Sequence, residues 1–111
     1  MRPLVHPAAE EIHLQGLLYA LADPMRLELF RKLAGTAQAP VNCIRCAPVE
    51  MPKSSLSRHI RILREAGLVR SERRGTEVVN RPRIEEVEAR FPGLLSAILM
   101  APRQSDSGTP T

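Results

Sequence analysis

The sequence has few aromatic residues, few cysteines and no long apolar run. Its 111 residues include two Phe, one Tyr and no Trp, so the core must consist mainly of Leu, Ile, Val and Ala side chains. Two cysteines are fewer than a secreted disulfide scaffold usually carries. No apolar stretch approaches the ~18 residues of a membrane-spanning helix, and Glu10 and Glu11 interrupt any secretory signal. We therefore expect one small cytoplasmic domain with reduced thiols and no membrane segment.

Positive charge is concentrated in one third of the chain. Residues 53–83 hold nine basic and three acidic side chains, whereas the remaining residues hold seven basic and nine acidic ones. Such a segment predicts a negatively charged partner, and nucleic acid is the first candidate. A solvated basic face without a partner is the alternative, but the same segment also has the pattern of a helix followed by a hairpin.

Two helices are predicted in the N-terminal third of the chain. A helix over residues 8–22 would have two apolar faces: one with Leu14, Leu17, Leu18 and Leu21, the other with Ile12 and Tyr19. Asp23 and Pro24 then open a second helix that ends near Gly35, because Asp is a good N-cap and Pro suits the first helical position. On this second helix Arg26, Arg31 and Lys32 are expected to point mostly outward.

The middle of the chain contains the clearest pattern. Three prolines leave room for at most one short helix between residues 36 and 52, around residues 42–47. The next helix spans Lys53–Ala66 and ends at Gly67. Two strands over residues 68–73 and 76–81 follow, with Gly75 supplying the positive φ of a tight turn. Helices are expected over residues 83–90 and 92–100, and a disordered tail over residues 102–111.

The helix over residues 53–66 has an apolar face and a basic face. B-form DNA admits such a helix into its major groove, where Arg and Ser bond base edges and phosphates, and a helix N-terminus attracts phosphate. The predicted DNA contacts are Lys53, Ser54, Ser55, Ser57, Arg58, His59, Arg61 and, in the hairpin turn, Arg73 and Arg74. His59 lies beside the apolar face, so a packing histidine is the plainer interpretation of that residue.

The first and last helices have more apolar surface than one small domain would cover. We expect a homodimer in which both helices take part. The predicted interface residues are Ile12, Tyr19, Leu94, Leu95, Ile98 and Leu99. For the last helix, plain intramolecular core is the alternative.

Two motifs resemble those of the ArsR/SmtB family of winged-helix repressors. The first is Ser57-Arg58-His59-Ile60-Arg61-Ile62-Leu63-Arg64-Glu65-Ala66-Gly67-Leu68-Val69, similar to that family's Ser-x-His-Leu-x-x-Leu-x-x-Ala-Gly-Leu-Val with one conservative change at Ile60. The second, Leu21-Ala22-Asp23-Pro24-Met25-Arg26-Leu27, looks like the family's Leu-x-Asp-x-x-Arg-Leu. The resemblance implies a homodimer, a double-stranded DNA site with two related half-sites, and repression relieved by a signal.

The nature of that signal depends on Cys43 and Cys46. The arsenic-sensing motif of the family would fall on Val41-Asn42-Cys43, where only Cys43 matches, and no His follows His59. The Cys-x-x-Cys pair has three interpretations: two thiols without a role, a redox pair open to oxidation or reactive sulfur, or a metal or metalloid site. We expect sensing at these thiols, by redox chemistry in preference to metal binding.

The predicted fold class is therefore mostly α with a β-hairpin wing, a dimeric winged helix-turn-helix. The expected organisation is an N-terminal extension over residues 1–7, the winged domain over residues 8–101 and the tail. The expected function is a DNA-binding transcriptional regulator, a homodimeric repressor released by a chemical signal, and not an enzyme. The alternative is a winged-helix module that binds an acidic protein and has no inducer.

Overall fold

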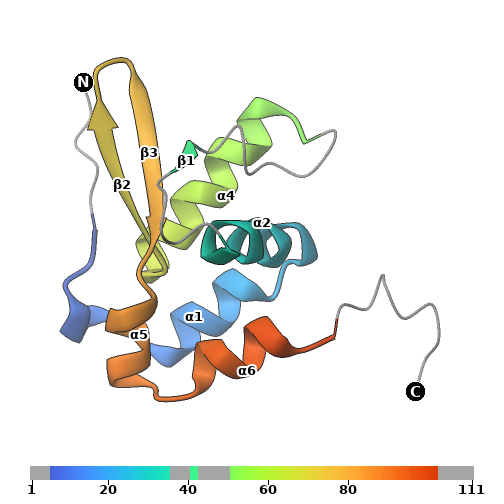
Figure 1. Cartoon of the computed structure of the whole chain (residues 1–111), viewed down its shortest axis with the longest axis vertical. Helices are drawn as coiled ribbons and strands as arrows, with labels where there is room; N and C mark the ends of the chain where they lie inside the picture. Colours follow the sequence, from blue (N-terminus) through green and yellow to red (C-terminus); the bar gives the residue numbers. More distant parts are fainter. Residues whose placement is uncertain (1–5, 36–40, 43–50, 103–111) are drawn as a thin grey trace.

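The computed structural model describes residues 6–35, 41–42 and 51–102. The elements are η1 (Ala9–Glu11), α1 (Leu14–Leu21), α2 (Pro24–Gly35), β1 (Val41–Asn42), α4 (Lys53–Ala66), β2 (Val69–Arg74), β3 (Glu77–Pro82), α5 (Ile84–Arg90) and α6 (Leu94–Met100). In Figure 1 the helices form a layered body from which the β2–β3 hairpin projects. Helices α1, α2 and α4 all contact one another, and α2 also contacts β3.

The first helical stretch is shorter than predicted, and the second begins as predicted. After η1 the backbone is extended at Ile12 and His13 before α1 starts. At the start of α2, Asp23 Oδ1 accepts hydrogen bonds from the backbone N–H groups of Met25 (2.9 Å) and Arg26 (3.0 Å). The bond from the Arg26 N–H is the main cause that lowers the pKa of Asp23. The predicted Asp cap is therefore confirmed.

Helix α4 ends at Gly67, whose φ of 94° is in the left-handed region. The Gly67 N–H bonds the Arg64 carbonyl at 3.1 Å, and the Leu68 N–H bonds the Leu63 carbonyl at 2.9 Å. These bonds satisfy carbonyls that a helix end leaves free. A Cβ at Gly67 would lie 2.5 Å from Ile12 Cγ1, so the backbone here passes directly over the Ile12 side chain.

The sheet is antiparallel with the order β1-β3-β2. The hairpin pairs Val69 with Pro82 at one end and Arg74 with Glu77 at the other. Both strands lie one residue later than predicted, and Gly75 has the expected positive φ, at 62°. Strand β1 was not predicted: Asn42, expected in a short helix, pairs instead with β3, and residues 43–47 lie outside the described residues.

The core is aliphatic around one phenylalanine, as the composition predicts. Phe30 is fully buried, and every long helix and the sheet contribute to the cluster around it. Its fully buried members include Leu17, Leu29, Leu33, Leu63, Leu68, Val69, Val87 and Leu95. Of the four leucines that the sequence groups on one face of the first helix, Leu14 and Leu18 are 39% and 49% exposed. The helix is rotated so that Ala20 takes part in the core instead.

Side chains from other elements hold α6 at both ends. The Glu88 carboxylate accepts hydrogen bonds from the backbone N–H groups of Gly93 (3.0 Å) and Leu95 (2.8 Å). Arg31 of α2 donates to the Leu99 carbonyl at 3.1 Å. The helix begins at Leu94, two residues later than predicted, after a left-handed Gly93 with φ of 84°. This arrangement places α6 beside α1 and α2 at the base of the molecule (Figure 1).

Candidate nucleic-acid interface

Helix α4 places an apolar face in the core and a polar face in solvent. Its buried residues are Leu56, His59, Ile60 and Leu63. The opposite side exposes Lys53, Ser54, Ser57, Arg58 and Arg61, with Ser55 half-buried. The periodicity thus predicted the two faces correctly apart from His59. A helix anchored in this way can offer its side chains to a groove without unpacking the domain.

Within the part of the chain that the structure describes, no side chain caps the N-terminus of α4. Pro52 is the N-cap residue, makes no side-chain cap bond, and no acidic residue lies in the first turn. The first N–H groups of a helix lack intrahelical partners, and the helix dipole makes this end favourable for an anion. Lys53 adds a positive charge at the same end. This end of α4 is therefore suited to a phosphate group.

The β2–β3 hairpin carries two arginines at its turn. Arg73 and Arg74 are both exposed. Arg74 lies 3.8 Å from a Glu72 carboxylate oxygen, and the same oxygen lies 3.7 Å from Arg81. Exposed pairs at such distances contribute little to stability, so the charge of Arg74 is available to a stronger anion. The predicted wing arginines are thus accessible.

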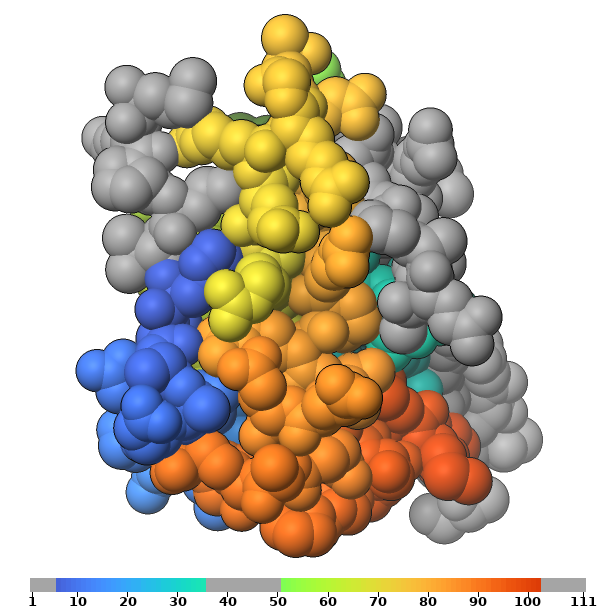
Figure 2. Space-filling view, turned by 60° about the vertical axis from the view of Figure 1, so that its left-hand side comes forward, coloured from blue at the N-terminus to red at the C-terminus, as the bar shows by residue number. Residues whose placement is uncertain are grey.

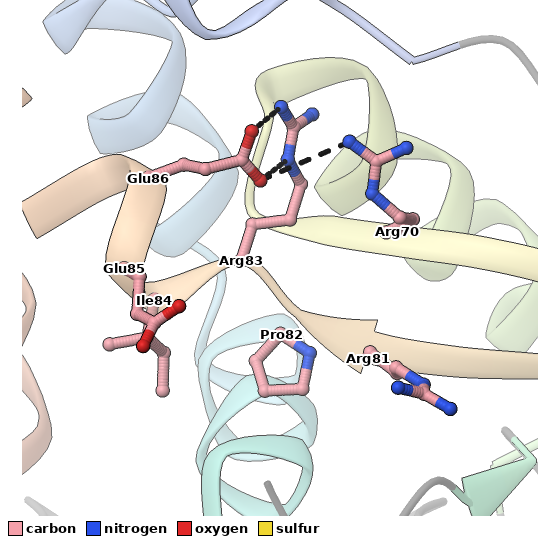
Figure 3. Close-up of a pocket in the computed structure, with 7 residues that line it drawn as sticks. All are labelled: Arg70, Arg81, Pro82, Arg83, Ile84, Glu85 and Glu86. Atoms are coloured by element: carbon pink, nitrogen blue, oxygen red, sulfur yellow. Dashed lines mark hydrogen bonds and ion pairs between the residues drawn. The ribbon is translucent and has the colours of Figure 1, made fainter.

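The root of the hairpin is held by a network around Arg83. This side chain is buried, and its Nε and Nη2 donate to the two Glu86 carboxylate oxygens at 2.7 and 2.8 Å. Its Nη1 donates to the Pro7 carbonyl at 3.0 Å. Arg70 of β2 approaches the same Glu86 at 3.9 Å (Figure 3). These bonds, chiefly those from Arg83, lower the pKa of Glu86 and tie the hairpin to α5.

Beside this network lies an open hollow of about 530 Å³. Arg70 and Arg81 of the hairpin line one part of it, and Ile84 and Glu85 of α5 another (Figure 3). The described part of the N-terminal segment, from residue 6 onward, lies against the root of β2 (Figure 2). There His6 Nε2 accepts a hydrogen bond of 2.9 Å from the Ser71 N–H. His6 and Pro7, predicted in a separate extension, thus contact the hairpin root.

Residues 21–72 match a family model described as a helix-turn-helix domain. The match runs from the last residue of α1 through α2 and α4 into β2, and the β2–β3 hairpin follows as the wing. With this hairpin, the described part of the chain has a winged helix-turn-helix fold. A helix-turn-helix domain is a DNA-binding unit and not a catalytic one. No curated protein sequence matches the chain significantly.

Two solved structures share this fold. One is an ArsR-like transcriptional regulator from Rhodococcus sp. RHA1, with 24% identity over 76% of this chain and 79% of that one and a TM-score of 0.57. The other is an ArsR family transcriptional regulator, with 24% identity over 96% of this chain and 100% of that one and a TM-score of 0.60. This winged helix-turn-helix domain therefore has the fold of ArsR-like regulators, as the two sequence motifs predicted.

The two motifs meet in the core of the winged domain. Arg26, expected to point outward, is 6% exposed, and His59, predicted as a DNA contact, is 5% exposed. Arg26 Nη1 lies 3.2 Å from His59 Nδ1. Both predictions are wrong for the same reason: each side chain finds its partner 33 positions away in the sequence. His59 cannot contact DNA while it is covered in this way, and the packing interpretation is correct.

The predicted dimer residues fall into three groups. Ile12 and Leu95 are 1% and 0% exposed within the single chain, so neither has surface left for a partner, and these two predictions are wrong. Tyr19 is 66% exposed. Leu94, Ile98 and Leu99 pack against the core and are half-buried. The larger exposed apolar side chains are Leu14, Leu18, Tyr19, Met25 and Met100.

Cys43 and Cys46 lie outside the described residues, so their predicted role stays a prediction. Among residues 6–35, 41–42 and 51–102, no three His, Cys, Asp or Glu side chains gather in a way that could hold a metal ion. Within the same part of the chain, no helix is long and apolar enough to cross a membrane.

Proposed function

We propose that this domain reads double-stranded DNA with α4 in the major groove and the β2–β3 hairpin on the flanking backbone. The observation that carries this proposal is the exposed row of Ser54, Ser57, Arg58 and Arg61 opposite a fully packed apolar face. The uncapped N-terminus of the same helix provides a place for a phosphate. Arg73 and Arg74 lie beside the hairpin turn, where they would contact phosphates or the minor groove.

The test is a fluorescence-anisotropy titration of the protein on its own promoter DNA and on random duplex. Arg58→Gln and Arg61→Gln should each weaken specific binding about 5- to 150-fold, the range for a lost base contact. Arg90→Gln removes the same charge from an exposed position on α5 and should change the DNA affinity little. Binding to promoter DNA that is no tighter than to random DNA, with the same salt dependence, would refute the proposal.

We also propose that the regulator acts as a homodimeric repressor on two related half-sites. Leu14, Leu18 and Tyr19 leave an apolar strip exposed on α1, and a small domain gains burial by covering such a strip with a second copy. Half-sites one helical turn apart require two recognition helices about 34–36 Å apart. Leu18→Glu should convert the dimer to a monomer in light scattering, while Ala89→Glu on exposed α5 should not.

The proposed signal is oxidation at Cys43 and Cys46. The two thiols would form a disulfide, and two electrons and two protons would pass to an oxidant such as peroxide. Because this segment joins α2 to α4, a new cross-link there would shift the recognition helices. Peroxide should release DNA from the parent protein and not from Cys43→Ser or Cys46→Ser. Equal release from all three proteins would exclude redox sensing, and metal analysis of the reduced protein tests the metal alternative.

The competing function is a winged-helix module that binds an acidic protein. Charge reversal distinguishes the two functions, because both would use the same basic face. If Arg58→Glu and Arg61→Glu leave DNA affinity intact, the basic face serves a protein partner.

A further inference from the structure

The buried contact between Arg26 and His59 has a defined proton arrangement. A guanidinium stays protonated and can only donate. Since Arg26 Nη1 lies 3.2 Å from His59 Nδ1, Nδ1 must be the acceptor. The imidazole is therefore neutral, with its proton on Nε2. Both side chains are more than nine-tenths buried, so water does not replace this bond when it is lost.

The same guanidinium holds the C-terminal end of α1. Its Nε donates to the Ala20 carbonyl at 2.6 Å, and its Nη2 donates to the Tyr19 carbonyl at 3.3 Å. The guanidinium carbon also lies 5.5 Å from the centre of the Tyr19 ring. Carbonyls at a helix end lack intrahelical partners and favour a cation. One rigid, forked side chain on α2 thus joins the end of α1 to the middle of α4.

The two ends of this connection are functionally distinct. Tyr19 belongs to the exposed apolar strip on α1 that we assign to the dimer partner. His59 follows Arg58 directly on α4, and Arg61 comes two residues later. Both arginines are exposed. A change in the position of His59 would therefore move the helical turn that carries Arg58 and Arg61, two of the proposed DNA contacts. If the dimer partner displaced α1, Arg26 would transmit that displacement to the same turn of α4.

We propose that Arg26 and His59 are positioning residues for DNA recognition, and that a proton on His59 ends the contact and weakens DNA binding. The inference rests on the proposed DNA-binding function. Protonated imidazole has two N–H donors and no acceptor, so it cannot receive the Arg26 hydrogen bond. It would also place a second cation against the guanidinium in a buried setting.

The charges around His59 favour the neutral form. Burial is the main cause that lowers the pKa of His59, and the positive charges of Arg26 on α2 and Arg58 on α4 lower it further. Asp23, the cap of α2, raises the pKa and opposes this effect. No charged group of α1 contributes to the pKa of His59; α1 offers Arg26 the carbonyls of Tyr19 and Ala20 and the Tyr19 ring. The contact is therefore complete at neutral pH and is lost only as the pH falls through the lowered pKa of His59, below its ordinary value of 6.5.

The test is the DNA dissociation constant measured from pH 8.0 to 5.5 at constant ionic strength. The parent protein should lose affinity severalfold by pH 5.5, and by no more than about tenfold, because the pKa of His59 lies below its ordinary value of 6.5. A lower pH adds positive charge to the protein as a whole, and added positive charge strengthens DNA binding. A loss of affinity at acid pH is therefore the opposite of this general effect. His59→Gln keeps an acceptor and never ionises, so it should bind well at pH 8.0 and show no acid loss. His13→Gln, at an exposed histidine, should keep the parent profile.

A second measurement does not depend on the variant. In ¹⁵N NMR of the parent protein, His59 Nδ1 should have the shift of an unprotonated nitrogen, and its pKa should fall further when DNA binds, because linkage is reciprocal. Circular dichroism at each pH shows that the protein stays folded. An affinity profile shared by the parent and His59→Gln, or a His59 pKa that DNA leaves unchanged, would overturn the inference. Absence of specific binding at pH 8.0 would instead contradict the proposed function.

Discussion

Replacement of Gly67 by alanine tests how the recognition helix is joined to the wing. Gly67 has φ of 94°, a conformation that costs a residue with a Cβ about 1–2 kcal/mol. An added Cβ would also lie 2.5 Å from Ile12 Cγ1 and 2.7 Å from Ile12 Cδ1. Ile12 is 1% exposed and β-branched, so it cannot turn aside freely. Overpacking of this kind costs about 1–3 kcal/mol more.

Together these two costs predict that Gly67→Ala lowers the free energy of unfolding by about 2–5 kcal/mol, a large part of the stability of a small domain. The assay is urea denaturation followed by circular dichroism at pH 7. The matched control is Gly93→Ala, because Gly93 has a similar φ of 84° and nothing within 4 Å of its Cβ position. That variant should lose only the backbone cost, about 1–2 kcal/mol.

The double variant Ile12→Ala/Gly67→Ala isolates the contact. Removal of the Ile12 side chain should cancel the steric part of the Gly67→Ala cost, which gives a coupling energy of about 1–3 kcal/mol. Equal destabilisation by Gly67→Ala and Gly93→Ala, together with no coupling to Ile12, would refute the close approach of the N-terminal segment to the end of α4.

Two further predictions concern the root of the wing. Arg83→Lys replaces a buried fork by a single ammonium group that cannot serve both Glu86 and the Pro7 carbonyl, so it should lower stability by about 1–3 kcal/mol. Arg81→Lys, at an exposed position, should have little effect in the same urea denaturation. Because bonds from Arg83 lower the pKa of Glu86, this carboxylate stabilises the fold above its ordinary pKa of about 4.5. That contribution is lost as the pH falls through the lowered value in the folded state, so Glu86→Gln should reduce the acid sensitivity of unfolding.

Much of the local structure followed from neighbouring residues. Asp23 and Pro24 specify the start of α2, because a cap and a fixed φ act within a few positions of the chain. The stop at Gly67 and the turn at Gly75 follow from backbone angles that few other residues adopt. The amphipathic pattern of residues 53–66 likewise gave the accessible face of α4, and with it most of the candidate site.

Other features depended on distant contacts. The periodicity of α1 allowed several rotations, and packing against α2 and α4 placed Ala20 inward and Leu18 outward. Strand β1 is only two residues long and pairs with β3 far along the chain, so no local pattern identified it. The burial of Ile12 and Leu95 removed both from the expected dimer interface, because apolar character alone does not tell intramolecular core from a surface between subunits.

The basic, amphipathic helix and the following hairpin with its arginine-rich turn could be recognised from the residues alone. Periodicity, caps and glycine angles act over a few residues and can be read along the chain. Which long polar side chains are buried depends instead on how distant helices pack against one another. Arg26 looks like a surface residue in its own helix, and the sequence placed His59 only at the border of the apolar face. Both are covered because packing of α1, α2 and α4 brings a donor, an acceptor and two carbonyls at the end of α1 together.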